Sequence, residues 1–218
     1  MRKFWLFFTF IIIFSGVLFL FLLIKDEKLP RAIKKEPALP PVQAQSISSP
    51  QAVAVGPKNA KVTVVQFFDF QCPYSKQAAP VVGELINEYS DTSVRFEFRH
   101  LPLVRIHPAA LPAAQAAMCA GEQGTDKFFK MYNLIFKNQE KLSESALSDN
   151  ARELQLNLSQ YNSCMAQGKY QGNILKDLMD SGKLKLEGTP TFFINSIPVV
   201  GAYPKDVYSD IIDQELAK

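Results

Sequence analysis

The sequence predicts an α/β domain that contains a long helical insertion and is preceded by a transmembrane helix. Three observations support this prediction. An uncharged stretch of 21 residues lies near the N-terminus, a strand, helix, strand pattern occupies residues 61–98, and helical patterns fill about 105–182 before two more strands. The 218 residues, of which 47% are hydrophobic, are enough for one globular domain with additional segments.

The first element is the apolar segment Phe4–Ile24, which has Arg2 and Lys3 before it and Lys25 after it. At 1.5 Å per residue, a helix of this length spans the roughly 30 Å hydrocarbon core of a bilayer. A cleavable signal peptide is the alternative, but its apolar region usually has about 7 to 15 residues with a cleavage site close behind. Here the nearest candidate site, residues 42–44, lies well beyond the apolar run. We predict an uncleaved anchor over residues 1–25.

The flanking charges leave the orientation of this helix open. More Lys and Arg follow the helix than precede it, so a strict positive-inside count would keep the C-terminal domain in the cytoplasm. Large domains are nevertheless translocated despite such charges, and the cysteines favour an oxidising compartment. We expect a single-pass protein of the cell membrane with its domain outside the cytoplasm. Residues 26–51, rich in Pro, Lys, Gln and Ser, predict an extended tether.

The basic excess of the chain belongs to its N-terminal flank. Residues 1–35 hold seven of the 24 Lys and Arg and two of the 21 Asp and Glu, which leaves 17 basic and 19 acidic residues in 36–218. The folded part therefore lacks the basic stripe that nucleic-acid binding requires, and we exclude that function.

The domain, residues 52–218, opens with a strand, a helix and a strand. Lys61–Phe70 is a near-continuous apolar run, which predicts a central strand buried on both faces. From Pro73 to Tyr89 apolar residues recur at helical spacing, and Pro73 suits the first turn. Ser93–Phe98 predicts a second strand, and such a unit forms a parallel pair.

A helical insertion follows, over about 105–182. Ala109–Ala120 is rich in alanine, Lys127–Phe136 is amphipathic, and three later segments continue the helical pattern. TFFIN and IPVVG, within 191–201, then predict two short strands, and Lys205–Leu216 predicts a closing helix.

Three segments resemble a known family: FFDFQCPYS after the first strand, LPLVRIHPAALPAAQAAMCA after the second, and GTPTFFINSIPVVGAY near the C-terminus. In this order they resemble the DsbA-like branch of the thioredoxin superfamily, over roughly residues 50–218. The resemblance implies a thioredoxin fold with a helical domain inserted between its halves. It also implies thiol-disulfide oxidoreductase activity on cysteine-containing proteins or small thiols, and we expect no cofactor.

The predicted nucleophile is Cys72, at the start of a helix. Unpaired backbone N–H groups and the helix dipole stabilise a thiolate there, whereas a merely buried cysteine would not need the proline-initiated helix start behind it. The resemblance implies that Pro190 is a cis-proline facing Cys72. Its loop, with Thr189, would pair with an extended substrate peptide. We expect Pro73 and Tyr74 to line the same contact.

Two residues depart from the family pattern. A mixed disulfide is normally resolved by a second cysteine three residues after the first, but Ser75 occupies that position and its hydroxyl is scarcely ionised at neutral pH. Ser75 is expected to donate a hydrogen bond to the Cys72 thiolate. Gln66 replaces a buried carboxylate that the superfamily often carries, although drift within a strand explains it equally well. The predicted activity is monothiol, with an outside thiol releasing each adduct.

The other two cysteines, Cys119 and Cys164, fall in the helical insertion. The resemblance implies a structural disulfide between them, which would stabilise the fold by roughly 4 kcal/mol in the chain-entropy model. Two free buried thiols are the alternative, and pairing of either with Cys72 is formally possible. A bridge within the insertion leaves Cys72 as the odd, reactive thiol.

The remaining polar residues do not indicate a second functional site. His100, His107 and the scattered cysteines lack the spacing of metal ligands, so we predict no metal site. His107, before a proline, is expected to start a helix. Asp69 is expected either to shape the loop at the strand end or to tune Cys72 electrostatically.

Two other functions remain open. Kappa-class glutathione transferases share the insertion topology and place a serine in a similar turn, so glutathione could be the nucleophile in place of Cys72. A catalytically silent module that binds unfolded or partner chains is the third hypothesis.

Overall fold

A computed structural model describes residues 47–90 and 93–218 of the protein. The predicted anchor and most of the predicted tether lie outside these residues. Within the described part of the chain, no helix is long and apolar enough to cross a membrane. The transmembrane helix over residues 4–24 therefore stays a prediction.

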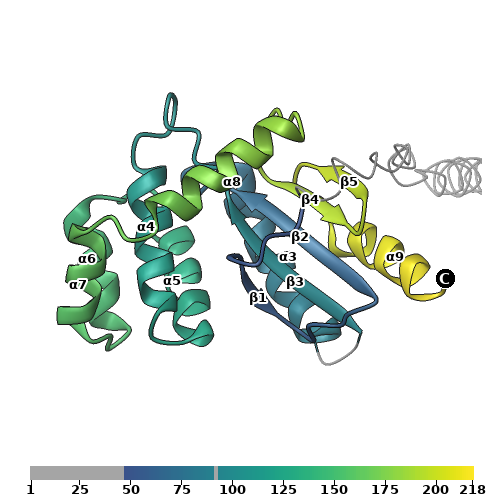
Figure 1. Cartoon of the computed structure of the whole chain (residues 1–218), viewed down its shortest axis with the longest axis horizontal. Helices are drawn as coiled ribbons and strands as arrows, with labels where there is room; N and C mark the ends of the chain where they lie inside the picture. The colour runs from purple at the N-terminus through teal and green to yellow at the C-terminus, as the bar shows by residue number, and fades with distance from the viewer. Residues whose placement is uncertain (1–46, 91–92) are drawn as a thin grey trace, which may run out of the picture. The chain divides into compact units, whose positions relative to one another are not determined.

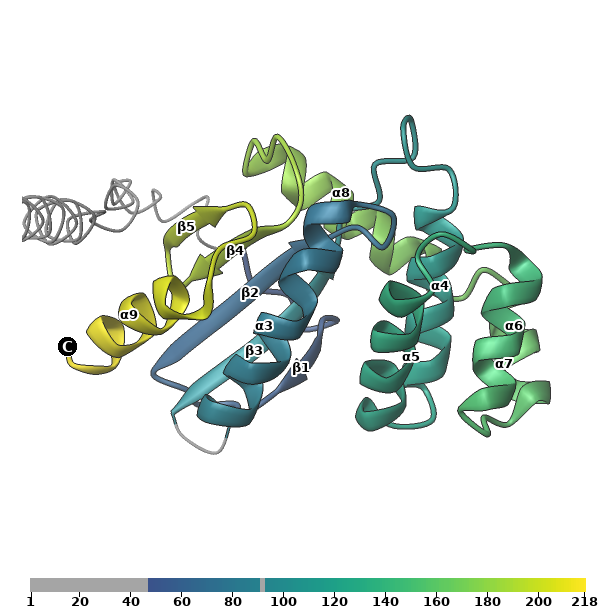
Figure 2. The same ribbon diagram turned by 180° about the vertical axis from the view of Figure 1, so that it is seen from behind.

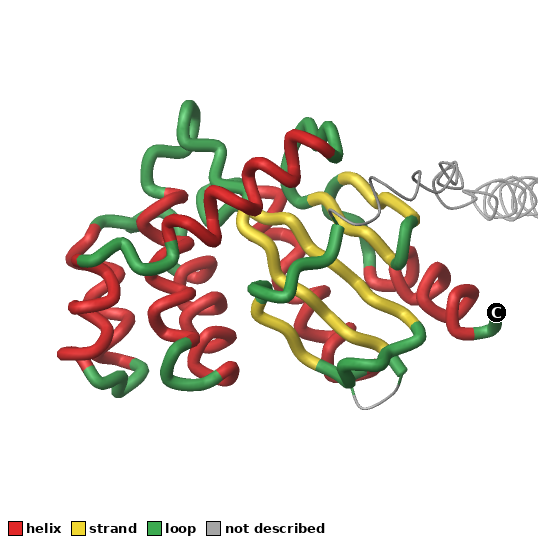
Figure 3. Tube along the Cα trace, viewed as in Figure 1, coloured by secondary structure: helices red, strands yellow, loops and turns green. Residues whose placement is uncertain are grey.

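A mixed sheet forms the centre of the described domain (Figure 1, Figure 3). Its strands are β1 (Val53–Val55), β2 (Val62–Phe68), β3 (Val94–His100), β4 (Thr191–Ile194) and β5 (Ile197–Val200). They lie in the order β1-β3-β2-β4-β5. β2 and β3 are parallel, as the strand, helix, strand pattern predicts, and the other neighbouring pairs are antiparallel. β1 went unpredicted because three residues are too few to show a periodic pattern.

Helices follow the predicted order along the chain. They are α3 (Pro73–Tyr89), α4 (Ala110–Gly121), α5 (Thr125–Lys137), α6 (Glu144–Glu153), α7 (Leu158–Ala166), α8 (Gln171–Lys183) and α9 (Lys205–Leu216). The segment predicted as a helical insertion contains α4 to α8, and the described residues between β3 and β4 form no strand.

Helices cover both faces of the sheet. α3 and α9 lie over one face (Figure 2), and α8 crosses the other (Figure 1). The side chains of β2 alternate between these layers: Val64 and Phe68 join the core on the α3 side, whereas Val65 and Phe67 join the core on the α8 side. β2 is therefore buried on both faces, as its continuous apolar run predicts.

The helical insertion shares the core on the α3 side. Aromatic rings of α5 pack directly on rings from the end of β2, with centroids 5.2 Å apart for Phe68 and Tyr132 and 5.0 Å apart for Phe70 and Phe136. The first pair is edge-to-face and the second is tilted, and aromatic contacts of this kind add to the free energy of burial. The contact holds the insertion against the end of β2, where the candidate site begins.

A buried arginine fixes α8 to the sheet. Arg99 of β3 is fully buried, and its Nε and Nη2 atoms donate to Asp177 Oδ1 at 2.8 Å and to Asp180 Oδ2 at 2.7 Å. Its guanidinium also stands over the Phe67 ring, 4.9 Å from the centroid. A buried cation is tolerated only when it is paired and hydrogen-bonded, so these two aspartates hold α8 in one position.

Candidate functional site

The turn between β2 and α3 carries the predicted nucleophile. Cys72 is the N-cap residue of α3 and Pro73 lies in the helix's first turn. The turn is closed by a hydrogen bond from Cys72 N to Asp69 O at 3.1 Å, and α3 begins with one from Lys76 N to Cys72 O at 3.1 Å. Cys72 is a free cysteine and only 6% exposed. Its sulfur thus lies at a helix N-terminus, where backbone N–H groups favour negative charge.

The Cys72 sulfur faces the loop before β4. Sγ donates to Thr189 O at 3.1 Å, across 117 positions of sequence. The Thr189–Pro190 peptide bond is cis, as the resemblance implied. Gly201, the residue after β5, holds this loop by donating a hydrogen bond from its N–H to Pro190 O at 2.8 Å. The hydroxyl of Thr189 is buried and has no hydrogen-bond partner among the described residues.

Ser75 differs from the expectation. Its side chain is fully buried, and its Oγ accepts from Asp69 N at 3.3 Å. Among the described residues no hydrogen bond joins Ser75 to Cys72, whose sulfur bonds Thr189 instead. The buried N–H of Asp69 needs an acceptor, and the hydroxyl of Ser75 supplies one. Ser75 therefore stabilises the turn in this structure through the backbone of Asp69.

Asp69 joins the nucleophile turn to the loop after β3. Its fully buried carboxylate accepts from Gln71 N through Oδ1 at 2.7 Å, and from Leu103 N through Oδ2 at 2.8 Å. His107 Nδ1 lies 2.8 Å from the same Oδ2 atom. Asp69 therefore shapes the loop at the strand end, one of its two expected roles. His107 does not begin a helix, because α4 starts at Ala110.

Two glutamines also brace the turn, and sequence reasoning missed both. Gln139, just beyond α5, donates from Nε2 to Phe70 O at 2.8 Å and to Cys72 O at 2.9 Å. Gln71 accepts from Ala109 N through its side-chain oxygen. Gln139 lies 67 positions from Cys72 within an ordinary polar stretch, so no local pattern signals its role.

Gln66 lies inside the core, on the same face of β2 as Phe68. It is 1% exposed, and its Oε1 accepts from the Tyr132 hydroxyl at 3.3 Å. Burial raises the pKa of Tyr132 above its ordinary value. Gln66 Nε2 has no partner among the described residues, and Gln66 lines a void of about 10 Å³ with Val64 and Val82. The side chain of Gln66 thus serves the packing of α5 on β2, away from the nucleophile turn.

Exposed apolar side chains occur on the turn and on the loop after β3. Tyr74, in the first turn of α3, is 62% exposed, and Ile106 is 70% exposed. Val104 is also exposed. The loop is tied to the turn through Asp69 and Gln71, so these exposed apolar side chains lie on two joined segments.

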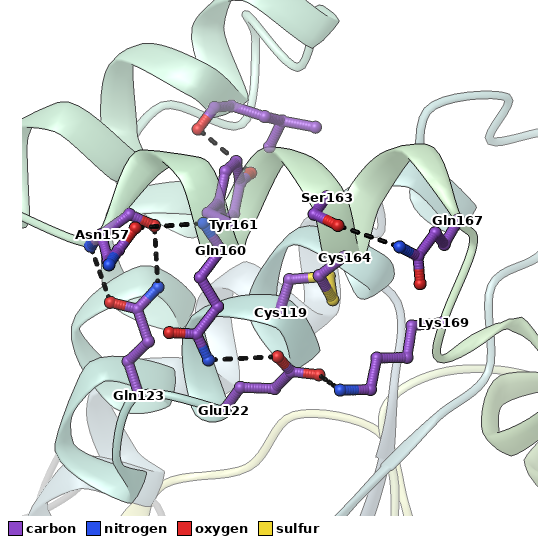
Figure 4. The surroundings of a disulfide bond; sticks show 11 residues. Cys119, Glu122, Gln123, Asn157, Gln160, Tyr161, Ser163, Cys164, Gln167 and Lys169 are labelled. Carbon is purple, nitrogen blue, oxygen red and sulfur yellow. Dashed lines mark hydrogen bonds and ion pairs between the residues drawn. A yellow bond between two sulfur atoms is a disulfide. The ribbon is translucent and has the colours of Figure 1, made fainter.

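The structure joins Cys119 of α4 and Cys164 of α7 in a disulfide, the pairing that the resemblance implied (Figure 4). Polar contacts around it link the same two segments. Gln160 donates to Glu122, and Lys169 forms an ion pair with Glu122 (Figure 4). The Lys169 ammonium holds the pKa of Glu122 below its usual range. This disulfide leaves Cys72 as the single free thiol of a chain that has three cysteines.

Comparisons with known proteins agree with this geometry. The model of a thioredoxin family matches residues 48–214. The thiol-disulfide exchange protein alpha-DsbA2 from Wolbachia pipientis has a similar structure, with a TM-score of 0.71 at 21% identity over 79% of this chain and 95% of that one. A thioredoxin-like oxidoreductase from Silicibacter pomeroyi gives a TM-score of 0.70 at 27% identity, over 80% and 98% of the two chains.

Curated proteins that are similar to this chain in sequence are named as Na(+)/H(+) antiporters, not as oxidoreductases. The Na(+)/H(+) antiporter NhaA 3 of Salinispora tropica is 42% identical over 148 residues, which are 68% of this chain and 22% of that protein. NhaA 1 of Salinispora arenicola is 37% identical over 162 residues, 74% of this chain and 24% of that protein. The matched segments thus make up about a quarter of the length of these relatives.

The family match covers residues 48–214, which are nearly all of the described domain, and the structural matches confirm the predicted thioredoxin fold with a helical insertion. The chain therefore belongs to the thioredoxin family and has the fold of its DsbA-like members.

Proposed function

We propose that the chain is a membrane-anchored thiol-disulfide oxidoreductase that acts outside the cytoplasm through mixed disulfides on Cys72. One observation carries the proposal: the only free cysteine thiol lies at the N-terminus of α3, 3.1 Å from Thr189 O, with Ser75 at the position of a second thiol. The first two features suit attack on a disulfide, and the third means that the resulting adduct has no internal thiol to release it.

The chemistry is that of a monothiol. The Cys72 thiolate attacks a disulfide R–S–S–R′, forms Cys72–S–S–R and expels R′S⁻. Ser75 cannot resolve this adduct, because a hydroxyl forms no stable bond to sulfur. An outside thiol must release it and is itself oxidised in doing so. Isomerisation and reduction of disulfides are thus supported, whereas transfer of a disulfide stored between positions 72 and 75 is not possible.

Substrate contacts come from both sides of the sulfur. Pro73 and the exposed ring of Tyr74 lie on the α3 side. On the β4 side, the backbone of Thr189, next to the cis-Pro190, is proposed to pair with an extended peptide. The proposed partners are cysteine-containing extracytoplasmic proteins and small thiols.

Two observations support the compartment. The Cys119–Cys164 disulfide is typical of oxidising compartments. A periplasmic thioredoxin-like protein from Salmonella enterica has a similar fold, with a TM-score of 0.66 at 19% identity. The apolar segment Phe4–Ile24 supplies the proposed anchor, and residues 26–51 the tether.

The test is intact-mass analysis of the full-length chain after incubation with an excess of oxidised glutathione or a disulfide-bonded peptide. We expect one reductant-labile adduct, mapped to Cys72, in the wild type and in Ser75→Ala, and none in Cys72→Ala. Absence of any adduct in the wild type would refute the proposal. Glutathione conjugation that survives Cys72→Ala would favour a transferase, and peptide binding without either reaction would favour a binding module.

A further inference from the structure

His107 lies beside the nucleophile turn and is held there by Asp69. Its Nδ1 atom is 2.8 Å from Asp69 Oδ2, and the backbone carbonyl of the same aspartate accepts from Cys72 N at 3.1 Å. The histidine and the cysteine thus bond to opposite ends of one residue. The order of strands also places β3, which leads to His107, and β4, which follows Thr189, on either side of β2, which leads to Cys72.

The imidazole is presented in a form suited to proton transfer. The carboxylate of Asp69 is fully buried and accepts Nδ1–H, which leaves the lone pair of a neutral ring on Nε2. Nε2 has no hydrogen-bond partner among the described residues, and the side chain is 18% exposed. A carboxylate that orients a histidine with an open outer nitrogen is the arrangement that general bases require.

The chemistry of the site creates a need for such a base. On the proposed function, each mixed disulfide at Cys72 must be released by an outside thiol, because position 75 is a serine. Only the thiolate attacks sulfur, and an ordinary alkyl thiol with a pKa of about 8.5 is only about 3% ionised at pH 7. We propose that His107 accepts the proton of this incoming thiol, directly or through one water, and that Asp69 is the positioning residue for His107.

Atoms and electrons balance in the proposed step. The incoming thiol R″–SH gives its proton to His107 Nε2 while its sulfur attacks the outer sulfur of Cys72–S–S–R. The S–S bond breaks, R–S–S–R″ leaves, and the electron pair returns to the Cys72 thiolate, which takes the proton from His107 or from water. The outer sulfur is the accessible target, because Cys72 itself is only 6% exposed.

The test measures release of a glutathione adduct from Cys72 of the full-length chain at pH 7, with two thiols in parallel. One is free cysteine, whose thiol has a pKa of about 8.5 and is mostly protonated, and the other is an aromatic thiol that is already ionised at this pH. His107→Gln keeps a donor for Asp69 but removes the basic nitrogen. The ratio of the two release rates is the readout, because a purely structural defect slows both thiols alike.

We expect this ratio, alkyl over aromatic, to fall by about 5-fold to 30-fold in His107→Gln, since full ionisation of a 3% ionised thiol is worth about 30-fold at most. Asp69→Asn should lower it less, and added imidazole should restore it in His107→Ala. An unchanged ratio in His107→Gln refutes the role of His107 while leaving the mixed-disulfide proposal intact. Failure of the wild type to form any adduct overturns both.

Discussion

His100 should make the stability of the protein depend on pH. The side chain is 2% exposed at the end of β3, and neither ring nitrogen has a partner among the described residues. Its ring packs 4.9 Å from that of Phe68 and 6.3 Å from that of Phe128, centroid to centroid. Burial lowers the pKa of His100 from 6.5 to about 3, because this apolar site cannot solvate an imidazolium.

Proton binding sets the sign of the effect. The unfolded chain takes up a proton at His100 as pH falls through 6.5, whereas the folded protein does so only near pH 3. Stability conferred by the neutral ring is therefore complete above 6.5 and is lost as pH falls from 6.5 towards 3. At 1.36 kcal/mol per pH unit, the loss is about 3 kcal/mol between pH 7 and pH 4, a large share of a typical folding free energy of about 5 to 15 kcal/mol.

The assay is urea unfolding monitored by circular dichroism at pH 7 and pH 4, for the wild type and His100→Leu. Both chains share their carboxylates, so the difference between their pH dependences isolates His100, and any packing defect of leucine cancels because it is present at both pH values. We expect the wild type to lose about 3 kcal/mol more than the variant. Equal losses in the two chains would show that the ring is solvated or protonated in the folded state.

Three further predictions concern the site and the insertion. Gln139→Met should destabilise the fold by about 1 to 3 kcal/mol, because it strips two buried carbonyls of a donor, whereas Gln123→Met, which loses an exposed amide, should cost less in the same urea assay. Ser75→Cys should form a disulfide with the nucleophile under oxidation, so thiol titration should find no free thiol; a persistent free thiol would contradict this. Replacing Cys119 and Cys164 by alanine should lower the unfolding free energy by roughly 4 kcal/mol for a separation of 45, and an unchanged midpoint would contradict it.

In the part of the chain that the structure describes, the side chain of Gln66, which stands where the superfamily often has a buried carboxylate, does not bond to the turn that carries Cys72 and Ser75. Its amide oxygen serves the Tyr132 hydroxyl of α5, and Ser75 bonds the backbone of Asp69 instead. The two departures from the family pattern therefore have separate partners in this structure. The chemical link between them, that a proton acceptor has little use without a second thiol, remains a hypothesis.

Most of the scaffold could be predicted because its signals are local. The continuous apolar run of β2 and the helical spacing after Pro73 each depend on residues close in sequence. Pro73 directly after Cys72 is a local signal that predicts a helix start at this cysteine. β1 was missed because it has three residues and becomes a strand only by pairing with β3.

The sequence by itself determined that a cysteine stands at the start of a helix with a serine three residues later, and it determined the order of the strands and helices other than β1, because these are properties of short segments. Only the tertiary structure decided what surrounds the sulfur. Thr189 is 117 positions from Cys72 in the sequence, and Gln139 is 67 positions from it. His107 is held beside the turn by its contact with the buried carboxylate of Asp69. Hydrogen bonds between distant segments form because buried polar groups must find partners when the segments pack together. No periodic pattern in the sequence indicates which partner each group will have.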